Sequence, residues 1–404
     1  MSLATLSEMT FHDQSQKSSP RNIPALPLEI IDIILREASK WPFRREERQV
    51  LTACTLVCKS WLPLAQRLLY HSVIVEADSA VVSRSPGRLG PEALLQRSHL
   101  LGFTRSLSIR VLGEGTANLP LSSKDDFPKG EQKRIQIPDF FVLLAHTPHL
   151  QYLKLSVPWA EKNIGPFESH IQDWLSSLVL PIEALEIDDG GFLDRRSTFV
   201  YDLVSIWPTI RALRLHTSRD KNGLPQERSS ISLRELSLSS NDFSATVIEW
   251  LLPPPPPNEP SNLQFLGLCR IPEEARAVLS VHGPSVSTLR LVLQPTFEID
   301  HLFTKLEELV IAGPSWSSPL PALPKTLKHI RLVRVYLSPD DVVAAVAQVV
   351  PILPDLRIIS IEEEFTASEY YLDLQKACEA HRVEILVSSL YSFGRTVVSA
   401  HQRF

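Results

Sequence analysis

A six-residue pattern, apolar-x-x-apolar-x-apolar, recurs through most of the chain. Each copy ends with two apolar residues spaced two apart, which is the period of a strand that buries one face. From residue 150 onward, successive copies begin 20 to 32 residues apart. A strand of three or four residues is not stable alone, so the repetition predicts a stack of short parallel strands joined by return segments. The copies are a weak TRSLSI at 104, then LQYLKL at 150, IEALEI at 182, IRALRL at 210, LRELSL at 233, LQFLGL at 263, VSTLRL at 286, LEELVI at 306, LKHIRL at 327 and LRIISI at 356.

Several return segments have the pattern of amphipathic helices. Residues 338–350 place Ser338 at an N-cap position, Pro339 at the first helical position and two carboxylates in the first turn. Residues 272–283 open with Pro and close with Gly, the asymmetry typical of helices. Residues 312–326, in contrast, are short and rich in Pro, which predicts an extended segment. Helical patterns are also present in 138–146, 167–180, 243–252 and 366–381.

A run of five prolines, residues 253–257, lies between a predicted helix and the strand copy at 263. Such a run adopts the polyproline II conformation. One interpretation is a stiff loop that returns the chain to the sheet on its convex side. The other is a ligand for an SH3-type groove.

The hydrophobic pattern is different in residues 23–75, where the repeat is absent. Here the spacing predicts three helices, over 27–38, 46–57 and 59–69, followed by a short strand at 73–75. The block therefore forms a separate, mainly helical module before the repeats.

The stretch LPLEIIDIIL, residues 26–35, has more apolar residues than one helix face can hold. Six apolar residues follow Pro27 and only Glu29 and Asp32 are polar, whereas a surface helix needs one apolar stripe about 100° wide. One interpretation is that part of this surplus contacts a partner. The alternative is that Ile31, Leu35 and Ile34 simply pack in the core of the module.

The composition argues against several classes of function, among them nucleic-acid binding and membrane insertion. The chain has 404 residues, 44% of them hydrophobic, and a net charge of −5, so it has no overall positive charge for binding nucleic acid or an anionic membrane. The most apolar stretch, 342–353, is short and contains Gln348 and Pro351, so it cannot span a bilayer. Only four cysteines and no Asn-x-Ser/Thr sequon are present, which favours a cytoplasmic or nuclear location. Residues 1–22 are expected to be a disordered leader and residues 392–404 a C-terminal tail.

Motifs for catalysis or metal binding are weak. Cys54 and Cys58 are four apart on a predicted helix, but no second ligand pair follows at metal spacing. The GEGTAN stretch at 113–118 lacks the third glycine of a dinucleotide loop, and no nucleophile elbow, phosphate loop or His-Glu-x-x-His occurs. We therefore expect no cofactor, no metal and no catalytic residues in the chain itself.

The repeated strands and helical returns resemble the leucine-rich repeat family in an irregular form, over about residues 100–390. The resemblance implies a curved solenoid with a parallel sheet on its concave side and helices outside it. The Asn or Cys that follows the strand in that family is mostly absent here. The fold class expected from the whole sequence is α/β, with a helical module at 23–72 and a horseshoe-like solenoid at 73–391.

The helical module resembles an F-box. The Leu-Pro-x-Glu-Ile-x-x-x-Ile-Leu opening, the LVCKSW stretch at 56–61 and the A-x-x-x-L-Y ending occur in the order of that family. An F-box binds the Skp-type adaptor of a cullin–RING ubiquitin ligase, so the resemblance implies an adaptor as partner. By resemblance, the adaptor-binding residues are Leu26, Pro27, Ile30, Ile34, Val57 and Trp61.

The function implied by these resemblances is that of a substrate-recognition subunit of a Skp–cullin–F-box ubiquitin ligase, itself non-catalytic. The alternatives are an interaction scaffold with no ligase role and, with little support from the residues, an enzyme built on a repeat fold. In each strand the residue between the two inward apolar positions points to the concave face, which is the expected surface for an unknown protein substrate. Its arginines suggest an acidic or phosphorylated ligand. The candidate substrate-binding residues are Tyr152, Lys154, Arg214, His216, Phe265, Arg290, His329 and Arg331.

Overall fold

The chain divides into two compact units, Met1–Leu68 and Leu69–Phe404, which are described separately. The leader at 1–22, the tail at 392–404 and Leu26 all lie outside the described residues. The computed structural model describes residues 27–39, 44–57, 59, 61–76, 94–110, 143–156, 169–188, 199–216, 224, 229–239, 243–292, 295, 298–312, 320, 322–333 and 339–388.

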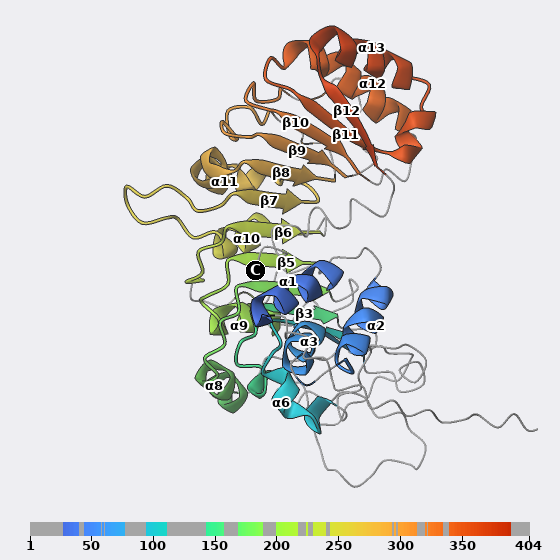
Figure 1. Ribbon diagram of the computed structural model, residues 1–404. Helices are drawn as coiled ribbons and strands as arrows, with labels where there is room; N and C mark the ends of the chain where they lie inside the picture. Colours follow the sequence, from blue (N-terminus) through green and yellow to red (C-terminus); the bar gives the residue numbers. More distant parts are fainter. Residues whose placement is uncertain are drawn as a thin grey trace, which may run out of the picture. The chain divides into compact units, whose positions relative to one another are not determined.

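The second unit is built on one parallel sheet of 12 strands, and the order of the strands in the sheet equals their order in the sequence (Figure 1). Each internal strand pairs in parallel with the strand before it and the strand after it, while β1 pairs with β2 and β12 with β11. This is an open α/β sheet with a solenoid-like succession of strands. The strands are β1 (Ser72–Glu76), β2 (Ser106–Arg110), β3 (Tyr152–Ser156), β4 (Ala184–Asp188), β5 (Ala212–Leu215), β6 (Glu235–Leu238), β7 (Phe265–Leu268), β8 (Thr288–Leu291), β9 (Glu308–Ile311), β10 (His329–Leu332), β11 (Ile358–Glu362) and β12 (Glu384–Ser388).

The register of the strands aligns one apolar residue of every repeat in a single row, which we call the leucine ladder. Leu153 pairs with Leu185, and the same register continues strand by strand to Ile359. Each member is at most 1% exposed. The sequence prediction of strands is thereby confirmed for the ten repeat copies, and the prediction of their inward residues for the nine copies from 150 onward. The ladder from β3 to β11 consists of Leu153, Leu185, Leu213, Leu236, Leu266, Leu289, Leu309, Ile330 and Ile359.

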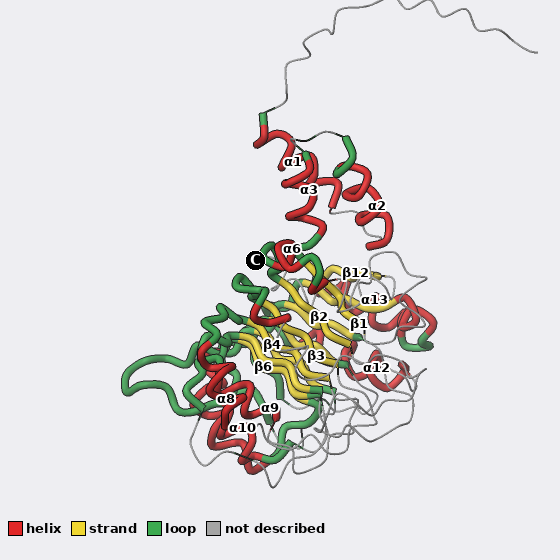
Figure 2. Tube along the Cα trace, turned by 90° about the horizontal axis from the view of Figure 1, so that it is seen from below, coloured by secondary structure: helices red, strands yellow, loops and turns green. Residues whose placement is uncertain are grey.

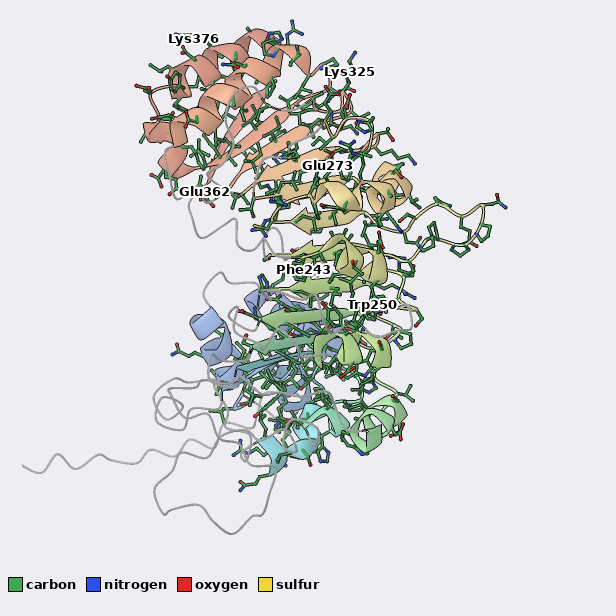
Figure 3. All side chains as sticks on the ribbon, turned by 180° about the vertical axis from the view of Figure 1, so that it is seen from behind. Phe243, Trp250, Glu273, Lys325, Glu362 and Lys376 are labelled. Carbon is green, nitrogen blue, oxygen red and sulfur yellow. The ribbon has the colours of Figure 1, made fainter. Side chains whose placement is uncertain are left out.

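Helices in the return segments cover the ladder side of the sheet. Their apolar faces share one core cluster with the ladder, and the view from behind shows the helices around Phe243, Trp250 and Glu273 lying over the strands (Figure 3). Tyr201 and Trp250 pack edge to face in this layer, with ring centroids 5.2 Å apart. The helices are α6 (Ser98–Leu101), α8 (Ser169–Ser177), α9 (Phe199–Ile206), α10 (Ala245–Leu251), α11 (Arg276–His282), α12 (Pro339–Val349) and α13 (Tyr371–His381), with 3-10 turns η1 (Glu273–Ala275), η2 (Gly283–Ser285), η3 (Val350–Ile352) and η4 (Glu363–Ala367).

Two local features of this unit differ from the sequence expectation. The helix expected over 272–283 is split, because η1 precedes α11. Strand β12, which pairs with β11, carries no copy of the six-residue pattern and was not predicted. It adds a final strand because Ile385 continues the ladder beside Ile359.

The described residues of the first unit form three helices close to the positions that the pattern predicts: α1 (Leu28–Ser39), α2 (Arg44–Cys54) and α3 (Leu62–Leu69), the last residue of which belongs to the second unit (Figure 2). Helix α2 ends three residues earlier than expected. The N–H groups of Leu56 and Val57 bond three residues back, and the Thr55 hydroxyl donates to the Thr52 carbonyl, which tightens the chain into a turn.

Helix α3 begins three residues later than expected. The Ala65 N–H bonds to the Trp61 carbonyl at 2.9 Å, which makes Trp61 the residue before the first helical turn. Pro63 then occupies that first turn, where its missing N–H removes no helical hydrogen bond.

Candidate functional site

Helix α1 has a buried apolar face. Ile31 and Leu35 are 2% and 0% exposed, and they lie four residues apart, on one side of the helix. Leu51 of α2 and Ala65 of α3 are equally buried, and α1 packs against α2. These four residues account for the apolar core of the three-helix unit among its described residues.

A second apolar face of α1 remains exposed. Ile30, Ile33 and Ile34 are 43%, 55% and 43% exposed, and at 100° per residue they span about 100° of the helix surface. The middle of this face lies about 130° from the middle of the buried one. We call Ile30, Ile33 and Ile34 the outer face of α1. Asp32 and Arg36, which form an ion pair at 2.7 Å, occupy the remaining polar side.

The outer face of α1 bears on whether the additional apolar residues of this helix contact a partner or pack in the core. Ile31 and Leu35 are core residues, as the simpler interpretation has it, but Ile34 is not. Ile30 and Ile34, both expected to contact an adaptor, lie together on this exposed face. Ile33 also belongs to it and was missed, although its i+3 spacing from Ile30 signals the shared face.

The other candidate adaptor residues have mixed environments. Pro27 is exposed, and its carbonyl accepts the N–H groups of Ile30 and Ile31 at 3.0 and 3.1 Å. Val57 is exposed in the turn after α2, next to the even more exposed Leu56, and Trp61 is half-buried. Sequence reasoning did not select Leu56.

The second candidate surface is the side of the sheet opposite the leucine ladder, which we call the polar face. Side chains alternate along a strand, so the residue between two ladder-side residues points to the polar face. The observed register aligns these residues into one row across the sheet. From β3 to β11 the row is Lys154, Glu186, Arg214, Ser237, Gly267, Arg290, Val310, Arg331 and Ser360.

The remaining candidate substrate-binding residues flank this row. Tyr152, Phe265 and His329 share a second register row on the same side of their strands, two residues before the first row's members. His216 directly follows β5, and its N–H bonds to the Ile187 carbonyl at 2.8 Å. The structure thus aligns all eight candidates with the polar face, as the strand period predicts.

A buried carboxylate, Glu186, organises one end of the polar face. Its Oε2 accepts the Tyr152 hydroxyl at 2.7 Å, and its Oε1 pairs with Lys154 Nζ. His216 Nε2 lies 3.8 Å from the same Oε1. Burial alone would raise the pKa of Glu186, but Lys154, Tyr152 and the charge of Arg214 outweigh it, so the pKa is below its usual value. Glu186 is therefore ionised at neutral pH and fixes two of the candidate side chains.

A second carboxylate, Glu308 of β9, has a similar role two strands before the last repeat copy, β11. Its Oε1 lies 2.9 Å from an Arg331 terminal nitrogen and 3.3 Å from His329 Nδ1. His329 Nε2 lies 2.8 Å from the Ser360 hydroxyl. Burial lowers the pKa of His329 and the Arg331 charge adds to this effect, while Glu308 opposes it. His329 is consequently neutral at neutral pH.

Ser360, His329 and Glu308 form a line that resembles a nucleophile, base and orienting acid. Ser360 lies inside β11, which pairs with both β10 and β12, so its backbone N–H groups are used in the sheet and cannot bind an oxyanion. Ser360 is also buried. The arrangement therefore acts as a set of polar contacts, in which Ser360 hydrogen-bonds His329 and the charge of Glu308 lies beside His329 and Arg331.

The middle of the polar face is shaped by Gly267. A Cβ at this position would lie 2.9 Å from Ser237 Oγ and 3.2 Å from the Phe265 ring, so a side chain does not fit here without a shift. The ring of Phe265 thus lies beside Gly267, close to the place where a side chain at residue 267 would begin. This aromatic and small-residue strip separates the Glu186 cluster from the Glu308 cluster.

The polar face has mixed charge. Glu186 lies beside Lys154 and Arg214 in the register. Glu235 is on the strand next to Arg214 and pairs in register with Ala212. Glu308 forms an ion pair with Arg331. The charge of Arg214 also opposes the rise in the pKa of Glu235 that burial causes. The expectation of an acidic ligand rested on the three arginines of the row. Glu186 belongs to the same row, and the structure adds Glu235 and Glu308 beside the basic residues on neighbouring strands.

Within the described part of the chain, no cluster of three or more His, Cys, Asp or Glu side chains is placed to hold a metal ion. Cys58 lies outside that part. None of the described helices has both the length and the apolar character needed to cross a membrane. Comparison of the sequence with models of protein families and with curated proteins finds no match.

Proposed function

We propose that the chain is the substrate-recognition subunit of a ubiquitin ligase of the Skp–cullin–F-box type. In this proposal α1–α3 are an F-box that binds a Skp-type adaptor, and the sheet unit is an irregular leucine-rich-repeat solenoid that binds a protein target. The chain performs no catalytic step of its own. It raises the effective concentration of target lysines near a conjugating enzyme in the cytoplasm or nucleus.

The outer face of α1 is the observation that carries this proposal. A stable three-helix unit that keeps Ile30, Ile33 and Ile34 about half exposed presents an apolar surface suited to a partner. Covering the accessible half of each side chain contributes about 1 kcal/mol per residue. The F-box resemblance of residues 23–72 indicates which kind of partner this is.

The polar face is the target-binding surface in this proposal. Aromatic and Arg side chains are enriched in protein-binding hot spots, and Tyr152, Phe265, Arg214, Arg290 and Arg331 all align with this face. Glu186 and Glu308 hold several of these side chains in place, which lowers the entropy lost when a target binds. The mixed charge favours a target surface that carries both signs.

Co-expression with a Skp-type adaptor tests the adaptor half of the proposal. The wild-type chain should co-elute with the adaptor, and the double variant Ile30→Asp, Ile34→Asp should bind at least about 30-fold more weakly, as for the loss of a hot spot of 2 kcal/mol. The matched control is the double variant Val281→Asp, Leu372→Asp, which adds the same two charges on α11 and α13 at residues that are 47% and 65% exposed. This control should bind like the wild type.

Equal binding by the double variant and the wild type would contradict the placement of the contact on α1. If the wild type itself does not bind, the non-ligase scaffold becomes the better account. Reconstitution with a cullin–RING core then separates a ligase subunit from a chain that merely binds the adaptor, because only the former supports ubiquitin transfer to a bound target.

A further inference from the structure

The return from α10 to β7 is unusually long for this sheet. Thirteen residues, 252–264, separate these two elements. The comparable returns from α8 to β4, α9 to β5 and η3 to β11 take six, five and five residues. Other returns of this unit therefore reach the next strand with about half as many residues. The additional length, which contains the proline run, is not needed for the return itself.

The ends of this return are anchored by one buried side chain, His282 of α11. Its Nδ1 lies 2.7 Å from the Ser261 hydroxyl, and its ring also hydrogen-bonds the backbone of Leu252. The Ser261 Oγ additionally accepts the Leu263 N–H at 3.2 Å. Leu252 and Ser261, nine residues apart in the chain, thus both contact the imidazole of His282, which fixes the base of the loop.

Between these anchors the loop projects away from the sheet (Figure 1). Pro254 and all residues from Pro256 to Pro260 are exposed, while Pro253 and Pro255 are partly buried. The tip is a turn in which the Glu259 N–H bonds to the Pro256 carbonyl at 3.0 Å and Asn258 has a φ of 70°. Proline fixes φ near −65°, so the run is stiff and lacks N–H donors.

We propose that residues 253–257 are a docking motif for a proline-recognition domain, a small domain with an aromatic-lined groove such as an SH3, WW or EVH1 domain. Such grooves bind extended proline runs because the ligand loses little conformational entropy on binding. The loop meets this requirement, since proline restricts the backbone of the run, three of its five prolines are exposed and the loop is anchored at both ends. Exposed Glu249 and Glu259 beside the run favour a groove with a basic rim.

This proposal is independent of the proposed ligase function, since it uses neither α1 nor the polar face. It replaces the simpler interpretation of the run as a stiff return loop. A stiff return accounts for the prolines but not for the added length or for the exposure of the run.

The test is the binding of the purified full chain to an array of purified SH3, WW and EVH1 domains, with affinities measured by calorimetry. The loop variant is Pro254→Ala, Pro256→Ala, Pro257→Ala. The matched control replaces three exposed prolines of other returns and turns, Pro148→Ala, Pro208→Ala and Pro354→Ala. Circular dichroism melting of both variants confirms that the fold is retained.

We expect at least one domain of the array to bind the wild type and the control equally, and to bind the loop variant at least ten-fold more weakly. The proposal is overturned if no domain in the array binds the wild type, or if the loop variant and the wild type bind with equal affinity.

Discussion

Regularly spaced apolar residues differ in exposure between the two units of the chain. In the sheet unit, every ladder residue from Leu153 to Ile359 is at most 1% exposed. In the helical unit, α1 buries Ile31 and Leu35 and leaves three other isoleucines of the same helix accessible. Apolar residues at regular spacing therefore mark core in the first case and both core and surface in the second.

The number of neighbouring elements explains this difference. Each internal strand has a strand on both sides, and the return segments, several of them helical, cover its ladder face, so a repeated apolar residue meets another one. A unit of three short helices encloses a small core and has room for only one face of each helix. Four predictions follow from this contrast, beginning with the largest expected effect.

Replacing a ladder residue should be costly. Leu266→Ala, in the middle of the sheet, should lower the free energy of unfolding by about 2–5 kcal/mol, because it leaves a cavity between two neighbouring leucines. Urea denaturation followed by circular dichroism measures this change. The control is Leu372→Ala on the exposed side of α13, which should change the free energy by no more than about 0.5 kcal/mol. Similar small changes for both variants would show that the ladder is not a packed core.

Removing the charge of Glu186 should have an intermediate effect. Glu186→Gln should lower the free energy of unfolding by about 1–3 kcal/mol at neutral pH, since Lys154 and Tyr152 lose a charged acceptor. Because the folded pKa is below the ordinary value of 4.5, the ionised carboxylate stabilises the fold above pH 4.5. That contribution disappears as the pH falls through the lowered pKa, so wild type and variant should converge in acid.

The matched control for Glu186 is Glu307→Gln. Glu307 pairs with Lys328 at 2.6 Å, but both side chains are about half exposed. Loss of this surface pair should cost no more than about 1 kcal/mol. A larger loss at Glu307 than at Glu186 would contradict the role given to the buried carboxylate.

Mild acid should destabilise the sheet unit through His282. Burial lowers the folded pKa of His282 below its ordinary 6.5, an effect that its bond to Leu252 only partly offsets. The unfolded chain then binds more protons just below pH 6.5, so stability is complete above that pH and falls as the pH decreases toward the folded pKa. The slope from one group is at most about 1.4 kcal/mol per pH unit.

Melting temperatures at pH 7.5 and 5.5 measure this dependence. The decrease should be smaller in His282→Gln than in the wild type, while His216 and His329 leave a residual decrease in both. An identical decrease in the two proteins would exclude His282 as a contributor.

The smallest effect is expected on the outer face of α1. Ile33→Ser should change the free energy of unfolding of the isolated chain by no more than about 0.5 kcal/mol, because the side chain is 55% exposed and makes little contact. A decrease above 2 kcal/mol would mean that this face packs within the chain and is not available to a partner.

Much of the sheet could be predicted because its signal is local and repeated. An apolar residue at every second position identifies a half-buried strand, and ten copies at similar intervals identify the order of the strands. Strand β12 was not predicted because it lacks the leading apolar residues of the pattern. Only its pairing with β11 reveals that it belongs to the sheet.

The candidate sites could be predicted only in part. The strand period alone places Lys154, Arg214 and Arg331 on the polar face. The same period places Glu186 in this row, but the contacts that Glu186 and Glu308 make with the basic residues could not be foreseen from it. Glu186 is 32 residues from Lys154, and Glu308 is 23 residues from Arg331, so their contacts depend on the register between strands.

The sequence by itself determined the strand positions, the inward ladder and the three helices before the repeats, because these depend on the spacing of residues along a short stretch. Tertiary structure alone decided that Ile34 is surface and Ile31 core, that Glu186 and Glu308 balance the basic residues, and that His282 anchors the proline loop at Ser261. Such contacts join residues that are distant in the chain. They depend on which elements become neighbours when the apolar surface is buried, and this choice is made by the packing of the whole unit.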